Sequence, residues 1–461
     1  MSGKDGTGLF DELAEQAAPP QPVGGRPRLR QAERGQVEMR ALSLDELVPA
    51  DHRVRQVWAF SEQLDLSCLY DRIRAVEGRP GHPPADPRIL LALWLYATIE
   101  GVGSARALAR LCREHVAFQW LCGGVSVNHK TLGDFRVDHG DLLERLLVDG
   151  FAALLRAGVV QLQRVAQDGM RVRAAAGAAS FRRLSTLEQC QHAAAERVRQ
   201  LKAEVNDDPG AASRRHVAAQ RRAAEDRQRR VTAALAVAEQ LDAARRGRGK
   251  RNDRSQPGKT DGDAPPPVAD EPGVKEPRAS TTDSQARVMK MADGGYRPAY
   301  NAQFATDTGS GLIAGLAVDN VGSDMGKLRP MSEQLAHDYG IYAAEHLVDG
   351  GFVKLDDLNA LHAAGVVVFA PVPAPRDRTR DRYAPLPEDP PGIAAWRVRM
   401  AGETAKAVYR ERAASAECTN AHARNRGLVR FTVRGIEKVK AVLCWYALAH
   451  NMACLWRLTP A

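Results

Sequence analysis

The chain has 461 residues, of which 44% are hydrophobic and 26% are charged, so it can fold around ordinary cores and is not a wholly disordered protein. Its 65 Lys and Arg residues outnumber its 56 Asp and Glu residues, and the net charge of +9 suits a polyanionic partner. An arginine-rich proteome would give the same excess, so the charge alone does not decide the function.

Neither the apolar segments nor the cysteines indicate a membrane or secreted protein. The longest apolar run, residues 89–99, is about half as long as a bilayer span requires. The first residues mix acidic and small polar side chains, so no signal peptide is predicted. The seven cysteines form no Cys-x-x-Cys pair and have no zinc-type spacing, which disfavours a disulfide scaffold and a zinc ribbon. We expect a cytoplasmic protein without a membrane partner.

The first third of the chain is predicted to be a tail followed by helices. Residues 1–36 are interrupted by Pro and Gly and are predicted to be disordered. Residues 37–158 are predicted to form an all-helical domain, in which Asp86, Ser104 and Asn128 precede helical segments as N-caps. Short helices separated by Gly breaks are typical of a helix-turn-helix arrangement.

A strand and a long insertion follow the helices. The strand is predicted over residues 159–167 and ends in Asp168-Gly169, and a continuation through Val172 and Arg173 is left open. Residues 181–254 hold 18 Lys and Arg against 10 Asp and Glu, and they predict a basic helical hairpin broken at residues 206–210. A solvated arm without a specific role is the alternative. Residues 255–278 contain six Pro and three Gly and predict a flexible linker.

Strands and helices alternate in the rest of the chain. Strands are predicted at residues 299–306, 312–318, 346–348 and 365–371, and helices at residues 325–338, 355–364, 403–425 and 436–458. An antiparallel pair that precedes parallel strands with crossover helices is typical of a mixed α/β sheet of the ribonuclease H kind. This catalytic domain is predicted to comprise residues 159–180 and 279–461.

Three carboxylates stand at matching points of this topology. Asp168 and Asp349 each follow a strand, and reacting groups gather at strand ends in open sheets. Glu417 lies inside the helix predicted at residues 403–425. Taken singly, an Asp-Gly after a strand is usually a turn, and a Glu in an Arg-rich helix is usually a surface ion-pair partner. The hypothesis of a site depends on all three falling at these points together.

Three convergent carboxylates repel one another and require a counter-charge. Because the ligands are hard oxygens without a nearby His or Cys, they favour Mg²⁺ or Mn²⁺. Two such ions can activate an attacking oxygen and stabilise the leaving oxygen in phosphodiester cleavage. At α-helical spacing one face of the third helix carries Arg410, Ala413, Glu417, Asn420 and Arg424, a face suited to holding a metal and gripping phosphates.

The stretch from Tyr409 to Arg412, followed by Glu417 and Arg424, resembles the Tyr–Arg–Glu–Lys signature of DDE transposases of bacterial insertion sequences. The resemblance is to the branch with an N-terminal helical domain and a long insertion after the first strand, and it covers residues 37–180 and 280–458. Further matches are Gln167-Asp-Gly169, Tyr300-Asn301-x-Gln303, Arg434-Gly-x-Glu437, Ala449-His-Asn451 and Asp349-Gly-Gly-Phe352.

The resemblance implies a catalytic metal-binding triad of Asp168, Asp349 and Glu417, with accessory positions that contact terminal DNA phosphates. These accessory positions are Tyr409, Arg412 and Arg424. The chain departs from the signature twice. Arg424 stands where Lys is usual, which keeps the charge. Four residues rather than three separate Arg412 from Glu417, which predicts that Arg412 lies off the face of the glutamate.

The implied activity is that of a transposase. It would bind the terminal inverted repeats of its element and the target DNA, both double-stranded, as a homodimer or larger assembly in the bacterial nucleoid. It would then cleave the ends and transfer them to the target. Lys130 and Arg136 are candidates for backbone phosphate contacts from the helical domain, or for helix capping alone. Two alternatives stay open, a decayed transposase that only binds the repeats and a ribonuclease H-like nuclease without strand transfer.

Overall fold

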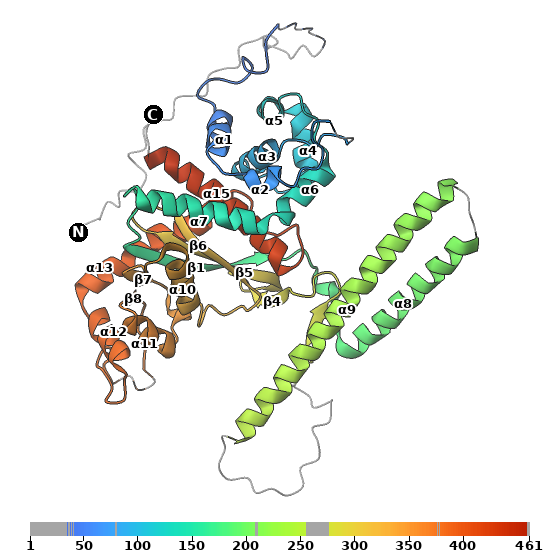
Figure 1. Cartoon of the computed structure of the whole chain (residues 1–461). Helices are drawn as coiled ribbons and strands as arrows, with labels where there is room; N and C mark the ends of the chain where they lie inside the picture. Colours follow the sequence, from blue (N-terminus) through green and yellow to red (C-terminus); the bar gives the residue numbers. More distant parts are fainter. Residues whose placement is uncertain are drawn as a thin grey trace, which may run out of the picture. The chain divides into compact units, whose positions relative to one another are not determined.

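Figure 1 shows the computed structural model of the chain. The structure describes residues 35, 37, 39, 41–78, 81–207, 211–254, 276–375, 377 and 379–458. The predicted tail, residues 1–36, lies outside the described residues except for Gly35, and the predicted linker lies outside them up to residue 275. The chain divides into two compact units, Met1–Ser43 and Leu44–Ala461, and the second unit holds all the elements that follow.

Short helices fill the N-terminal part of this unit. They are α1 (Arg53–Glu62), α2 (Ser67–Tyr70), α3 (Pro87–Ile99), α4 (Ala105–Glu114), α5 (Val116–Cys122), α6 (His129–Asp138) and α7 (Gly140–Arg156). The three predicted caps are confirmed, since the side chains of Asp86, Ser104 and Asn128 accept hydrogen bonds from backbone N–H groups of the first turns of α3, α4 and α6.

The N-terminal helices share one hydrophobic core with the C-terminal helix. Helix α3 is apolar on most faces and is buried along most of its length. Its Trp94 stacks at a tilt on Trp445 of α15 (Ile436–Leu458), with ring centroids 6.4 Å apart. The same cluster of buried side chains continues into the sheet through Met170 and Phe304. Burial of this continuous surface therefore stabilises the helices and the sheet together.

One mixed sheet forms the centre of the unit. Its strands are β1 (Arg164–Arg173), β4 (Arg287–Lys290), β5 (Tyr296–Asp307), β6 (Ile313–Asp319), β7 (Glu345–Leu347) and β8 (Val367–Phe369). Their order is β4-β5-β1-β7-β8, with β6 also paired to β5. Strand β5 is antiparallel to β1, β4 and β6, whereas β1, β7 and β8 are parallel. The predicted antiparallel pair followed by parallel strands is confirmed.

The first strand starts and ends later in the chain than predicted. Strand β1 begins at Arg164 and continues to Arg173, so Asp168 lies in the middle of the strand opposite Phe304 of β5 and not at its end. The long antiparallel ladder with β5 extends the strand beyond Asp168, whereas the parallel partner β7 pairs only with Arg164–Ala166. The structure confirms the continuation through Val172 and Arg173 that the sequence left open.

Helices cover the sheet and complete the chain. They are α10 (Leu328–Tyr339), α11 (Leu355–Ala363), α12 (Pro391–Ala401), α13 (Glu403–Arg412), a π-helix (Ala413–Glu417), α14 (Cys418–Asn425) and α15, with short 3₁₀ turns at Ala178–Ser180 and Gly350–Phe352. The single helix predicted at residues 403–425 is interrupted by the π-helix. Helix α12 was missed, although Ile393, Trp396 and Met400 carry its buried, helically spaced face.

The inserted segment leaves and re-enters the fold through a small sheet. Strands β2 (Phe181–Arg183) and β3 (Arg278–Ser280) pair antiparallel, and between them lie α8 (Leu184–Asp207) and α9 (Ala211–Arg254). The two helices run side by side in Figure 1 and contact each other. Leu187 of α8, Ala234 of α9 and Ala279 of β3 form a small core at the base of the arm. In the described part of the chain, no helix combines the length and apolar character needed to cross a bilayer.

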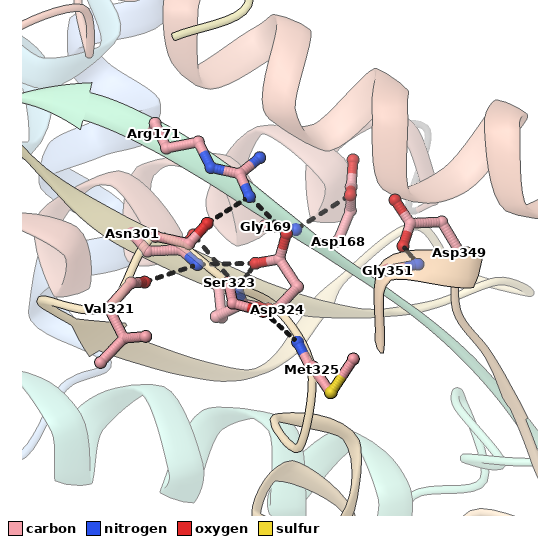
Figure 2. A network of polar contacts seen from close by, with 12 residues as sticks. Asp168, Gly169, Arg171, Asn301, Val321, Ser323, Asp324, Met325, Asp349 and Gly351 are labelled. Carbon is pink, nitrogen blue, oxygen red and sulfur yellow. Dashed lines mark hydrogen bonds and ion pairs between the residues drawn. The ribbon is translucent and has the colours of Figure 1, made fainter. Parts of the chain in front are cut away.

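A buried polar network braces β1 and β5 on the side of Asp324, a carboxylate that is 7% exposed (Figure 2). Its Oδ1 accepts hydrogen bonds from Asn301 Nδ2 at 2.6 Å and Gln303 Nε2 at 2.7 Å. Its Oδ2 accepts one from Arg171 Nη2 at 2.8 Å. Since every donor comes from the paired strands, the network fixes their register from one face.

Replacing Gly169 by Ala should strain this network. A Cβ at Gly169 would lie 2.3 Å from Asp324 Oδ1 and 2.4 Å from Gln303 Nε2, so at least one of these buried groups must leave its partner. We expect the free energy of unfolding to fall by about 1–3 kcal/mol, measured by urea denaturation.

The matched control is Gly150→Ala in α7, where an added Cβ meets no atom within 4 Å. Because Ala is the better helix former, this control should leave the free energy of unfolding unchanged or raise it slightly. Equal effects of the two substitutions would contradict the role of the close approach at Gly169.

The fully buried His346 predicts a loss of stability in mild acid. Burial in β7 lowers the pKa of this imidazole to about 3; its Nδ1 is hydrogen-bonded to Ser332 Oγ at 2.7 Å, and its Nε2 has no hydrogen-bond partner. Since the unfolded chain binds a proton there below about pH 6.5 and the folded chain does not, stability should fall by about 2 kcal/mol between pH 7 and pH 5. His346→Gln should remove this part of the acid sensitivity in urea unfolding at each pH.

His337→Gln is the control, because the His337 side chain is 88% exposed on α10. This substitution should leave the pH dependence of unfolding as it is. A pH slope that His346→Gln leaves unchanged would show that another group is responsible for the acid sensitivity.

Candidate active site

The pairing of β1 with β7 brings the two predicted aspartates level with each other. Ala166 is paired in parallel with Leu347, so Asp168 and Asp349 occupy corresponding positions two residues further along their chains. Figure 2 shows the two side chains next to each other at the sheet. Asp349 lies two residues after the end of β7, and its Oδ1 accepts a hydrogen bond from Gly351 N at 2.7 Å. The prediction that the strands bring Asp168 close to Asp349 is confirmed.

The Asp168 side chain is 19% exposed. Its Oδ1 accepts from Gly169 N and its Oδ2 from Asn420 Nδ2, both at 2.9 Å. Burial raises the pKa of Asp168 and the neighbouring charge of Asp349 adds to this rise, while Arg412 and the two hydrogen bonds oppose it. Two carboxylates that lie close together form a site that attracts cations.

The helix that carries Glu417 contains a π-turn at Ala413–Glu417. In an α-helix, Arg412 and Glu417 would point in different directions, as the sequence predicted from the four intervening residues. The π-turn hydrogen-bonds residues five apart, and it brings Arg412 Nη2 to 2.9 Å from Glu417 Oε1. The prediction that Arg412 lies off the face of Glu417 is therefore wrong. π-Turns of this kind occur frequently at functional sites.

Arg412 connects the carboxylates of the sheet and the helix. Its side chain is 13% exposed, and Nη1 lies 3.7 Å from Asp168 Oδ1 while Nη2 binds Glu417. The guanidinium also lies over the ring of Tyr409, 5.9 Å from its centroid. The charges of Glu417 and Asp349 both act on the half-buried Tyr409 hydroxyl, whose pKa is raised mainly by burial. The three predicted carboxylates thus belong to one electrostatic cluster with a protein cation between them.

Two buried polar atoms in this cluster have no hydrogen-bond partner. They are Nη1 of Arg412 and Oδ1 of Asn420, both beside Asp168. Unsatisfied buried polar atoms are uncommon in folded proteins and often mark a position that a ligand, ion or water completes. In the described part of the chain, no group of three or more His, Cys, Asp or Glu residues is arranged to hold a metal ion as it stands. Glu417 is bound to Arg412 instead.

The residues predicted to contact DNA have different environments. Arg410, Arg424 and Lys130 are exposed. Asn420 is 3% exposed, and its side chain binds Asp168. It therefore positions the Asp168 carboxylate and does not lie on a surface that DNA could contact. The π-turn also breaks the uniform α-helical spacing on which the shared face from Arg410 to Arg424 was predicted.

Arg136 belongs to the core and not to a DNA-contacting surface. It is 7% exposed, its guanidinium lies 4.6 Å from the centroid of the Trp94 ring, and Nη1 donates to Gly103 O and Thr432 Oγ1. Since these groups enclose the cation, it cannot reach a phosphate in this conformation. The prediction of a phosphate contact at Arg136 is corrected accordingly.

Sequence reasoning missed the residues that brace the site. Asp324, Arg171 and Gln303 support β1 next to Asp168, but only Gln303 stood in a quoted motif. Asp324 follows Ser323 in an irregular segment after β6, where no periodicity distinguishes it. A pattern of buried polar side chains at strand positions was the one available signal, and it requires the strand boundaries to be known.

Two parts of the chain match protein families. Residues 42–138 match the family described as Transposase domain (DUF772), and residues 393–456 match the family described as Transposase DDE domain. The first range contains α1 to α6, and the second contains Arg412, Glu417 and all but the last two residues of α15. No curated protein and no solved structure matches the chain. The two matches lie on either side of the sheet strands in the sequence, and both support a DDE transposase of an insertion sequence.

Proposed function

We propose that the chain binds the terminal inverted repeats of its element and catalyses cleavage and strand transfer at one metal-dependent site. The observation that carries this proposal is the cluster in which Asp168 is level with Asp349 and is joined to Glu417 through Arg412. The strand order β6-β5-β1-β7-β8, antiparallel on one side of β1 and parallel on the other, supports a ribonuclease H-like catalytic core.

The donor set of the cluster fits divalent metal ions. Asp168, Asp349 and Glu417 offer hard oxygen ligands, which favour two Mg²⁺ or Mn²⁺ ions. The unpartnered Oδ1 of Asn420 adds a further oxygen beside Asp168. Such ions would activate the attacking oxygen and stabilise the leaving oxygen of an in-line phosphoryl transfer. Glu417 can reach them only when Arg412 releases it, since the two are hydrogen-bonded here.

Within this proposal, the protein residues position DNA and balance charge. Before DNA binds, the positive charge of Arg412 partly offsets the negative charges of Asp168 and Glu417 and reduces the repulsion between them. Once displaced, its guanidinium is available for bidentate contact with a terminal phosphate, together with Tyr409. The exposed Arg410 and Arg424 flank Glu417 in the sequence and add positive charge to the same helical segment.

The parts of the chain would divide the work. The helices of residues 37–158, with exposed Lys130, would recognise the repeats, and residues 159–180 and 279–461 would perform the chemistry. The basic arm, residues 181–254, would bind DNA without sequence specificity. Its net charge of +8 is nearly the whole net charge of the chain, +9. Joining two ends requires at least two active sites, so we propose a homodimer or larger assembly on DNA.

Asp349→Asn should abolish Mg²⁺-dependent cleavage of a duplex that carries the element end, while binding to that duplex stays within about twofold. The substitution removes a ligand charge from the cluster but leaves the acceptor for Gly351 N in place. Nicking on a denaturing gel and binding by fluorescence anisotropy are measured on the same preparation.

Asp356→Asn is the matched control, an exposed aspartate in the first turn of α11. It should leave both cleavage and binding unchanged. Cleavage that survives Asp349→Asn would remove the site assignment, and absence of cleavage by the parent chain would favour a decayed DNA-binding protein. Cleavage without joining of a pre-cut end to target DNA would favour a nuclease.

Arg412→Gln should strengthen Mn²⁺ binding to the DNA-free chain by about tenfold, because it removes the cation that competes for Asp168 and Glu417. Free Mn²⁺ is measured by electron paramagnetic resonance during titration. Arg410→Gln, two residues earlier and exposed, is the control and should leave the affinity unchanged. Weaker Mn²⁺ binding in Arg412→Gln would contradict the proposed competition.

A further inference from the structure

Two cysteines and two histidines gather near Glu417 and line one cavity. Cys418 and His422 lie four residues apart on α14, and His450 and Cys454 lie four residues apart on α15. Residues at this spacing share one face of a helix. Each helix thus presents one sulfur and one imidazole, and the two helices contact each other.

The donor atoms within each pair already have the separation of metal ligands. Cys418 Sγ lies 3.6 Å from His422 Nε2, and Cys454 Sγ lies 3.3 Å from His450 Nε2. Two ligands of a tetrahedral zinc ion, one at 2.3 Å and one at about 2.05 Å, are about 3.5 Å apart. Between the pairs, the rings of His422 and His450 have centroids 5.7 Å apart.

All four side chains line one cavity. Its volume is about 320 Å³, and the hairpin turn at Gly311 and the side chain of Arg457 complete its wall. His450 and Cys454 are buried at its floor, whereas Cys418 is exposed at its rim. The cavity therefore gives an ion access from solvent and leaves the exposed pair free to turn toward the buried one.

We propose that Cys418, His422, His450 and Cys454 form a structural zinc site. Thiolate and imidazole ligands favour Zn²⁺ over Mg²⁺ or Mn²⁺, so this site would be chemically distinct from the carboxylate cluster. Sequence spacing did not reveal it, because the pairs are separated by 27 intervening residues between His422 and His450 and follow no zinc-finger pattern.

Small adjustments close the site. No three of these donors are yet placed around one ion, so Cys418 and His422 must turn inward. His450 Nε2 must exchange its 2.9 Å contact with Gly311 O for the metal. Arg457 Nη2 donates to Cys454 Sγ at 2.9 Å, a contact that orients the sulfur.

The site would fasten the catalytic helix to the core. Cys418 directly follows Glu417, and Asn420 on the same helix binds Asp168. A zinc ion shared by α14 and the buried α15 would limit the rotation of α14 and so hold Glu417 and Asn420 at a constant distance from the sheet.

The test is metal binding by the full-length chain in the Asp349→Asn background, which weakens the carboxylate centre and needs no DNA or activity. The reduced, metal-free protein is titrated with Co²⁺ and then with Zn²⁺. We expect one equivalent of Co²⁺ with the thiolate charge-transfer band and the intense visible bands of tetrahedral coordination, displaced by Zn²⁺. Zn²⁺ should also raise the thermal unfolding temperature.

Cys418→Ser and, separately, His422→Ala should weaken Co²⁺ binding by about 100-fold. Cys418→Ser should also remove the part of the charge-transfer band that comes from the Cys418 thiolate. Circular dichroism should show that both variants are folded. Cys190→Ser in α8 is the matched control and should bind like the parent. Octahedral Co²⁺ without a charge-transfer band, or binding that both variants leave unchanged, would overturn the proposal. So would a Cys418–Cys454 disulfide whose reduction yields no metal uptake.

Discussion

The guanidinium of Arg412 balances the charge of carboxylates that come from distant parts of the chain. Asp168 from β1 and Glu417 from the π-turn would repel each other without it, and burial makes the cost at Asp168 larger. The π-turn makes this arrangement geometrically possible, since it carries one more residue than an α-turn between the cation and the glutamate. The protein therefore supplies, from its own side chains, the positive charge that metal ions would supply during the proposed reaction.

Helix α15 links this cluster to the rest of the molecule. It packs against α3, α6, α7 and β6, and the side chain of Asn451 binds both the backbone N–H and the carbonyl oxygen of Ile313 at the start of β6. The helices that match one transposase family and the segment that matches the other thus share a hydrophobic core.

The sequence predicted the elements whose patterns are local. Helix α15, the hairpin of β5 and β6, and the caps at Asp86 and Ser104 follow from periodicity and turn residues alone. The position of Asp168 within its strand did not, because the ladder to β5 is a long-range contact that no local pattern encodes.

The same limit applies to the candidate site. Neighbouring aspartates follow from topology, and the pairing of β1 with β7 confirms that they are close. The contact between Arg412 and Glu417 depends on a π-turn, and the burial of Arg136 depends on Trp94 from another helix. In both cases the tertiary environment overrides the spacing read from an ideal helix.

The two short strands at the base of the arm pair with each other, from Phe181↔Ser280 to Arg183↔Arg278, and not with the central sheet. The length and sequence of residues 184–277 can therefore change while the central sheet keeps its register.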